Sequence, residues 1–276
     1  MSATTPVSGE TGTDTGAGRG TGKTTAAGRS AALARAELTL LGRSKATLAA
    51  AVFVPLTLPF SLRSTVDQMD LKGTGLSVGS VVLPSSVGLS LLFAVYSSLV
   101  SVYAARREEL VLKRLRTGEL RDAEILAGAA LPSVAIGLAQ CLVLTVACAA
   151  LLDVGAPPAP HLAVLGLLLG LAMWPLLAAI TANFSKSVEG AQVAAMPLIL
   201  VSLLGSGTFF PLQVMPDRLA SACELLPLTP VVTLIRGGWT GDLSAHDTLG
   251  ALGTAVAWIA LAVFAVRQWF RWEPRR

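Results

Sequence analysis

The charged residues of this chain are grouped, and long apolar stretches lie between the groups. Six stretches of 17 to 33 residues contain no Asp, Glu, Lys or Arg. A helix needs about 20 predominantly apolar residues to cross the hydrocarbon core of a membrane. The pattern therefore predicts an all-α, polytopic integral membrane protein with six transmembrane helices. The predicted spans are residues 46–62, 77–104, 125–152, 162–183, 189–210 and 247–267.

Two segments with different patterns precede the first predicted span. Residues 1–29 consist mainly of Gly, Thr, Ser and Ala, which predicts a disordered tail. In residues 30–46, apolar side chains such as Leu33 and Leu40 recur at helical spacing, and the basic residues lie on other faces. This pattern predicts an interfacial helix that lies on the inner membrane surface and leads into the first span.

The segment between the fifth and sixth predicted spans is apolar but interrupted. Its longest charge-free run, residues 225–235, is 11 residues long and contains two prolines. Such a run is too short to cross a membrane. We therefore expect residues 211–240 to form an outer hairpin of one or two short helices, which lie on or dip into the outer leaflet. Arg218 and Glu224 are expected to stay on the water side.

Composition supports the membrane assignment, and the distribution of charge gives an orientation. The chain is 53% hydrophobic and only 14% charged, with a net charge of +4. If the N-terminus is cytoplasmic, 17 of the 21 Lys and Arg residues fall in cytoplasmic segments and four in outer segments. Cytoplasmic loops of membrane proteins carry such an excess. We expect a multi-pass protein of the cell (plasma) membrane with both termini in the cytoplasm, and the net charge gives no indication of nucleic-acid binding.

The sequence offers little for catalysis, metal binding or a bound cofactor. A loosened phosphate-loop pattern, Ala17 to Thr24, lies in the low-complexity tail, where no strand pattern precedes it. Only two histidines occur, His161 and His246, which leaves no His pair for zinc and no nucleophile–His–acid set. We expect no catalytic residue, no metal site and no ATP site in this chain, so it is not expected to be an enzyme.

The predicted spans contain uncharged polar residues but no carboxylates or basic groups in their interiors. Ion-coupled carriers generally bury ionisable residues within their spans, so the pattern argues against that class. The uncharged polar side chains either form hydrogen bonds between helices or contact a substrate. Gly166 and Gly170 also match a motif for close helix packing. The candidates for a substrate path are Tyr96, Gln140, Gln192, Ser202 and Ser206.

One densely charged segment lies between the second and third predicted spans. A helix over residues 106–117 would place Val111 and Leu112 on one side and most charged side chains on the other. Glu109 and Lys113 would form a favourable i, i+4 pair. The segment is either a solvated loop that fixes topology or a docking element for a cytoplasmic partner. The candidate docking residues are Arg107, Glu108, Glu109, Leu110, Lys113 and Arg114.

These residues resemble the cytoplasmic coupling segment of type-2 ATP-binding-cassette (ABC) exporter permeases, which commonly reads Arg-Glu-x-Gly-Thr-Leu-x-x-Leu. This chain begins the same pattern at Arg107, with Leu110 and Val111 in place of the usual Gly-Thr. Residues 32–58 resemble the entry helix and first span of that family, and residues 207–237 resemble its outer hairpin. Together the three motifs place the resemblance over a six-span permease domain of residues 30–272.

The resemblance implies a transport subunit without an ATPase site of its own. It would pair with a second permease copy, most simply as a homodimer, and with separate ATPase subunits that hold ATP and Mg. The segment 106–117 would be the cytoplasmic coupling helix that docks with the ATPase. The substrate would be a small amphipathic drug, antibiotic or lipid-like molecule, as for the actinobacterial drug and antibiotic exporter permeases that the chain resembles. The alternative is a non-transporting membrane scaffold or immunity protein that binds another cytoplasmic partner.

Overall fold

The computed structural model describes residues 57, 63–64, 77–112, 121–152, 154–208, 212 and 215–270. The tail (1–29), the interfacial helix (30–46) and almost all of the first predicted span (46–62) lie outside the described residues. The described elements are α3 (Val78–Ser90), η1 (Leu91–Ser97), α4 (Ser98–Glu108), α6 (Asp122–Leu151), α7 (Pro160–Ala182), α8 (Val188–Gly205), α9 (Asp217–Glu224), α10 (Leu228–Thr240) and α11 (Ala245–Trp269).

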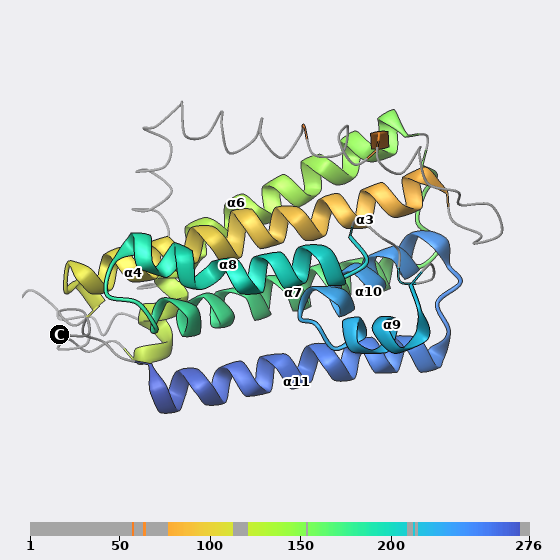
Figure 1. Ribbon diagram of the computed structural model, residues 1–276. Helices are drawn as coiled ribbons and strands as arrows, with labels where there is room; N and C mark the ends of the chain where they lie inside the picture. Colours follow the sequence, from red (N-terminus) through yellow and green to blue (C-terminus); the bar gives the residue numbers. More distant parts are fainter. Residues whose placement is uncertain are drawn as a thin grey trace, which may run out of the picture.

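The described part of the chain is an elongated bundle of helices (Figure 1). Five of its helices are long and apolar enough to cross a membrane, and the number rises to six if the bent pair α9–α10 counts as one span. The elements α3, η1 and α4 together form the longest of these helices, Val78–Glu108. The prediction of an all-α polytopic membrane protein is therefore confirmed. We call the two ends of the bundle the α4 end, where α4 terminates, and the α3 end, where α3 begins.

The longest helix lies at the centre of the bundle. Its three elements contact α6, α7, α8 and α10. Side chains along its whole length are fully buried, including Leu83, Leu91, Tyr96 and Leu99. In a membrane, helices gain nothing from burying apolar side chains away from lipid, so a central position depends on close packing and interhelical hydrogen bonds. Both are present around this helix, as described below.

Helix ends differ by a few residues from the predicted spans, because capping side chains rather than charges fix them. Ser77 begins α3 with a reciprocal capping box, in which its hydroxyl accepts from the Ser80 amide at 3.1 Å. Ser187 accepts from the Gly190 amide at 3.1 Å and begins α8. The α8 helix ends at Gly205, five residues before the end of the predicted span 189–210.

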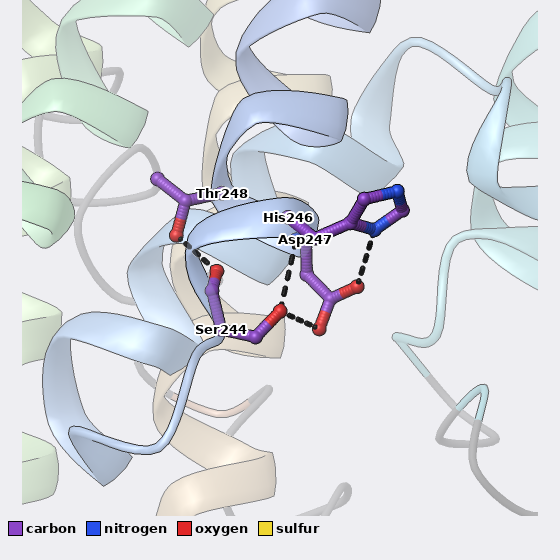
Figure 2. Close-up of polar contacts among 4 residues, drawn as sticks. All are labelled: Ser244, His246, Asp247 and Thr248. Carbon is purple, nitrogen blue, oxygen red and sulfur yellow. Dashed lines mark hydrogen bonds and ion pairs between the residues drawn. The ribbon is translucent and has the colours of Figure 1, made fainter.

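The cap of α11 is the best-defined of these ends (Figure 2). The Ser244 hydroxyl accepts from the Asp247 amide at 3.0 Å and donates to the Asp247 carboxylate at 2.7 Å. The Thr248 hydroxyl donates to the Ser244 carbonyl at 2.8 Å. The negative charge of the carboxylate is also stabilised at this position, because a helix N-terminus carries partial positive charge. His246 is almost fully exposed and lies 3.6 Å from the Asp247 carboxylate, so it contributes to this end and to no metal site among the described residues.

The outer hairpin predicted over 211–240 is not superficial throughout. The helices α9 and α10 meet at an angle of 99° across a short break. Arg218 and Glu224 on α9 are exposed, as expected. In contrast, α10 is buried from Leu228 to Gly238 and packs against α7, α3 and α11. The second limb therefore enters the bundle, as one half of a broken span or as a re-entrant helix. It does so because it is apolar and because α7 presents glycines to it.

Gly166 and Gly170 on α7 permit this close approach. A Cβ atom at Gly166 would lie 2.9 Å from the Leu234 Cβ atom and 3.1 Å from the Val231 carbonyl oxygen, both on α10. A Cβ atom at Gly170 would meet only side-chain termini, at 2.8 Å from a Leu91 methyl group. Backbone and Cβ atoms cannot move without moving the helix, whereas side-chain ends can rotate. The motif seen in the sequence is therefore a packing site, and Gly166 is its stricter position.

We expect Gly166→Ala to lower the free energy of unfolding by about 1–2 kcal/mol, because overpacking between α7 and α10 outweighs the gain in helix propensity. Gly253→Ala on α11 is the matched control, since a Cβ atom there would meet nothing within 4 Å. That variant is expected to be as stable as the unsubstituted protein or slightly more stable. Thermal unfolding of each purified variant in the same detergent compares their stabilities. Equal stability of the two variants would contradict the assigned packing.

Candidate functional site

The segment singled out by its charge lies at the α4 end, but its helix is not continuous. Residues 106–108 extend α4, and the chain then turns at Glu109 and Leu110. Leu110 has φ +59°, in the left-handed region. This conformation is costly for a residue with a Cβ atom and ends the helix. The expectation of one helix over 106–117 is corrected accordingly: a turn separates α4 from residues 111–112, which are helical again.

The resemblance noted above contained a signal for this turn. The pattern of the type-2 exporter permeases has glycine at the position of Leu110, and glycine is the residue that adopts positive φ without strain. Helical periodicity could not reveal the turn, because neither Glu109 nor Leu110 breaks helices by itself. The turn projects Glu108, Glu109 and Leu110 outward, and all three are exposed. They form what we call the exposed tip.

Arg107 behaves differently from the other candidate docking residues. Its side chain is 2% exposed, and its Nη2 atom donates to the Ser185 carbonyl in the loop between α7 and α8. A side chain buried in this way is not presented to a partner protein. Within the chain, Arg107 joins the end of α4 to the α7–α8 loop. Lys113 and Arg114 lie outside the described residues.

The α7–α8 loop also contacts the end of α11. The Asn183 side-chain amide donates to the Trp269 carbonyl at 2.9 Å. The Ser185 hydroxyl donates to the Ser187 carbonyl at 2.7 Å, just before α8 begins. Four helices therefore meet through one five-residue loop at the α4 end, the same end that carries the exposed tip (Figure 1). Sequence reasoning missed Asn183 and Ser185, because short polar side chains in a loop resemble ordinary turn residues.

Three of the five candidates for a substrate path form interhelical hydrogen bonds. The Tyr96 and Thr181 hydroxyls lie 2.9 Å apart, which links η1 to α7. The Ser90 hydroxyl donates to the Gln140 amide oxygen at 3.1 Å, which links α3 to α6. The Gln192 amide donates to the Ser97 carbonyl at 2.9 Å, which links α8 to η1. These bonds surround the central helix on three sides.

The central helix contains a π-helical stretch, η1, where these bonds converge. A π-helix closes i to i+5 hydrogen bonds and occurs mostly at functional positions in longer helices. Tyr96 and Ser97 both belong to η1, and Gln192 bonds with both the carbonyl and the hydroxyl of Ser97. Gln192 therefore links α8 to the last residue of η1 through two hydrogen bonds. No feature of the sequence predicted η1.

Of the remaining two candidates, Ser206 directly precedes Gly207, which contacts a buried cation, and Ser202 lies one turn earlier on α8. Arg236 on α10 is 7% exposed, and its Nη2 atom donates to the Gly207 carbonyl at 2.9 Å. Gly207 has φ +70° and lies in the loop that follows α8. Within the described residues, the buried hydroxyls of Ser202, Ser206 and Thr208 have no hydrogen-bond partner. The charge pattern predicts an outer position for Arg236, within the hairpin 211–240, and the structure shows this residue buried because α10 packs against α7, α3 and α11.

The described residues show no arrangement typical of an enzyme. No group of three or more His, Cys, Asp or Glu side chains lies close enough to hold a metal ion among them. The phosphate-loop-like residues 17–24 are outside the described part of the chain. The described residues form a membrane bundle with a polar network around its central helix. At the α4 end, which carries the exposed tip, one loop joins four helices. These features are those of an integral membrane transport component.

The comparison with family models agrees with this class. Residues 30–239 match the model of the ABC-2 type transporter, which is the membrane domain of that family. The match covers the charged segment, the whole of α3–α9 and nearly all of α10. The chain belongs to the ABC-2 type transporter family and is a permease component, a multi-pass membrane protein that is not itself catalytic. A comparison with curated proteins gave no match.

Proposed function

We propose that this chain is the permease subunit of an ATP-driven exporter and that it works with separate ATPase subunits. ATP and Mg would be held by those subunits, and no ATPase site would exist in this chain. Family membership supports the proposal, since an ABC-2 permease implies an ABC ATPase partner, typically in a dimeric assembly. The observation that carries it in this structure is the exposed tip, Glu108 to Leu110, at the end of the central helix.

The exposed tip is suited to docking. It presents two carboxylates and one apolar side chain, and Leu110 is 38% exposed. A partner with a basic rim and an apolar pocket would complement it. Arg107 would transmit the contact, since it links the base of the tip to the α7–α8 loop. Lys113 and Arg114 are proposed to extend the same docking surface. With ATPase bound at this end, the α4 end and both termini would be cytoplasmic.

The proposal also covers the transported substrate, the direction of transport and the number of permease copies. A path lined mainly by apolar residues, with Tyr96, Gln140, Gln192, Ser202 and Ser206 as its polar points, would suit a small amphipathic drug, antibiotic or lipid-like molecule. Export is the direction that the family resemblance implies, including its resemblance to actinobacterial drug-resistance permeases. A homodimer of permeases is the simplest assembly, because this chain supplies a single set of spans.

We expect Glu109→Lys to weaken association with the ABC ATPase subunit encoded nearest to this chain by about tenfold, because a like charge would then face a basic rim. Co-purification in lipid nanodiscs measures the association, and ATP hydrolysis reports its consequence. Glu224→Lys is the matched control, since Glu224 is equally exposed but lies on α9.

If both variants bind the ATPase as the unsubstituted chain does, the exposed tip is not the docking site. If the unsubstituted, membrane-inserted chain binds no ATPase at all, the transporter proposal fails. The alternative of a non-transporting scaffold or immunity protein, with another cytoplasmic partner for the tip, would then be favoured.

A further inference from the structure

A large cavity opens at the α4 end, away from the exposed tip. Its volume is about 980 Å³, at the upper end of the range for small-molecule sites. Residues of α4, α6, α7 and α11 border it. The start of α6 and the end of α11 lie at this end of the bundle, as Figure 1 shows. One interhelical hydrogen bond lies in its wall, from the Tyr103 hydroxyl to the Leu126 carbonyl at 3.1 Å, and no residue of the exposed tip lines the cavity.

The cavity has an apolar interior because small side chains line it. Ala127 and Ala130 on α6 face this space, as do Ala172 and Ala179 on α7. Alanines leave room that larger residues would fill, and the remaining wall is aliphatic or aromatic, with Leu126, Val134, Leu176 and Phe270 among its residues. A space of this kind favours hydrocarbon, because water inside it would find few polar partners.

The cavity also has charged residues, and they come from two helix ends. Arg121 immediately precedes α6, and Arg267 lies in the last turn of α11. Both side chains are exposed, and neither guanidinium has an ion-pair partner among the described residues. The one carboxylate among the lining residues, Asp122, already takes part in another interaction. Two guanidinium groups beside an apolar space complement a molecule with an anionic head and a hydrocarbon tail.

We propose that this cavity binds an anionic phospholipid of the inner leaflet, with its phosphate at Arg121 and Arg267 and an acyl chain in the alanine-lined interior. The inner-leaflet assignment rests on the orientation proposed above, in which the α4 end is cytoplasmic. Arginine fits this role because its planar guanidinium can bond two phosphate oxygens at once. Occupancy would place a lipid between α6 and α11, next to the α7–α8 loop that joins four helices at this end.

The test measures lipid retained by the purified full-length chain. The chain is reconstituted into vesicles of phosphatidylcholine and phosphatidylglycerol in equal amounts, extracted with mild detergent, and analysed by native mass spectrometry. We expect the unsubstituted chain to retain phosphatidylglycerol preferentially. The double variant Arg121→Gln/Arg267→Gln is expected to lose about tenfold in that retention, because two phosphate contacts are removed. The control Arg218→Gln removes one exposed arginine on α9 and should retain phosphatidylglycerol as before.

A second pair of variants tests the cavity separately from the charge. Ala127→Trp fills the cavity and should abolish retention, whereas Ala139→Trp, also exposed on α6 but not in the cavity wall, should not. The proposal is overturned if the unsubstituted chain retains both lipids equally, if the double arginine variant keeps its preference, or if either control loses lipid as its partner does. Lipid retention needs no ATPase, so these outcomes are distinct from a failure of the transporter proposal.

Discussion

Arg107→Ala is expected to lower the free energy of unfolding by about 3 kcal/mol and to reduce coupling between ATP hydrolysis and transport. The reason is the position of Arg107 at the base of the exposed tip, where its guanidinium bonds with the Ser185 carbonyl. Removing the side chain leaves a buried carbonyl without this donor and creates space around a fully buried stem. The link between α4 and the α7–α8 loop is then lost.

The measurement pairs thermal unfolding of the variant in detergent with transport assayed in vesicles containing the ATPase. Arg106→Ala is the control, since it removes the same charge from the adjacent, less buried position. Because Arg107 is not part of the exposed tip, ATPase association itself should change little. Equal stability of the two variants would contradict the structural role given to Arg107. A complete loss of ATPase binding in Arg107→Ala alone would show that Arg107 belongs to the docking surface.

Arg236 gives the second large expected effect, and here the choice of replacement matters. Arg236→Ala is expected to lower the free energy of unfolding by about 3 kcal/mol. The substitution leaves a cavity beside α10 and an unpaired Gly207 carbonyl. Arg236→Met keeps most of the volume and removes the buried charge. Replacing a buried charge by an apolar side chain of similar size is often neutral or stabilising. We therefore expect the free energy of unfolding of the Met variant to be within about 1 kcal/mol of that of the unsubstituted protein.

Thermal unfolding of both variants, with transport measured in parallel, separates stability from function. A stable Met variant that no longer transports would assign the charge of Arg236 to the substrate path, together with the unpartnered hydroxyls of Ser202 and Ser206. A Met variant as unstable as the Ala variant would contradict the prediction. It would mean that the guanidinium itself, through partners beyond Gly207, holds α10 in the bundle.

Much of the architecture could be predicted from the spacing of charged residues alone. Lys72 and Arg106 bracket most of the central helix, and Glu124 and Asp153 bracket most of α6. This works because a charge within the hydrocarbon is costly, so charges mark where helices leave the membrane. The same logic failed for Arg236. Burial inside protein, with a carbonyl as acceptor, lets a cation enter the bundle, and hydropathy does not distinguish that case from exposure to water.

The site was only partly predictable for related reasons. Glu108, Glu109 and Leu110 are expected to face a partner, and all three are exposed. Arg107 shares their sequence context, but its burial depends on a loop 78 residues away. Long-range contacts of this kind leave no periodic signal. The π-helical turn and the positive φ of Leu110 likewise leave no mark in the helical periodicity of the sequence.

The central helix is also longer than a membrane requires. Val78–Glu108 has 31 residues, which gives a length of about 45 Å, against a hydrocarbon thickness of about 30 Å. The neighbouring α8 has 18 residues and a length of about 27 Å, close to that thickness. The central helix therefore exceeds that thickness by about 15 Å, which is about three turns. Its midpoint, Phe93, falls within η1. If the two ends extend equally beyond the hydrocarbon, η1 lies at the middle of the bilayer, together with the Tyr96 and Gln192 contacts.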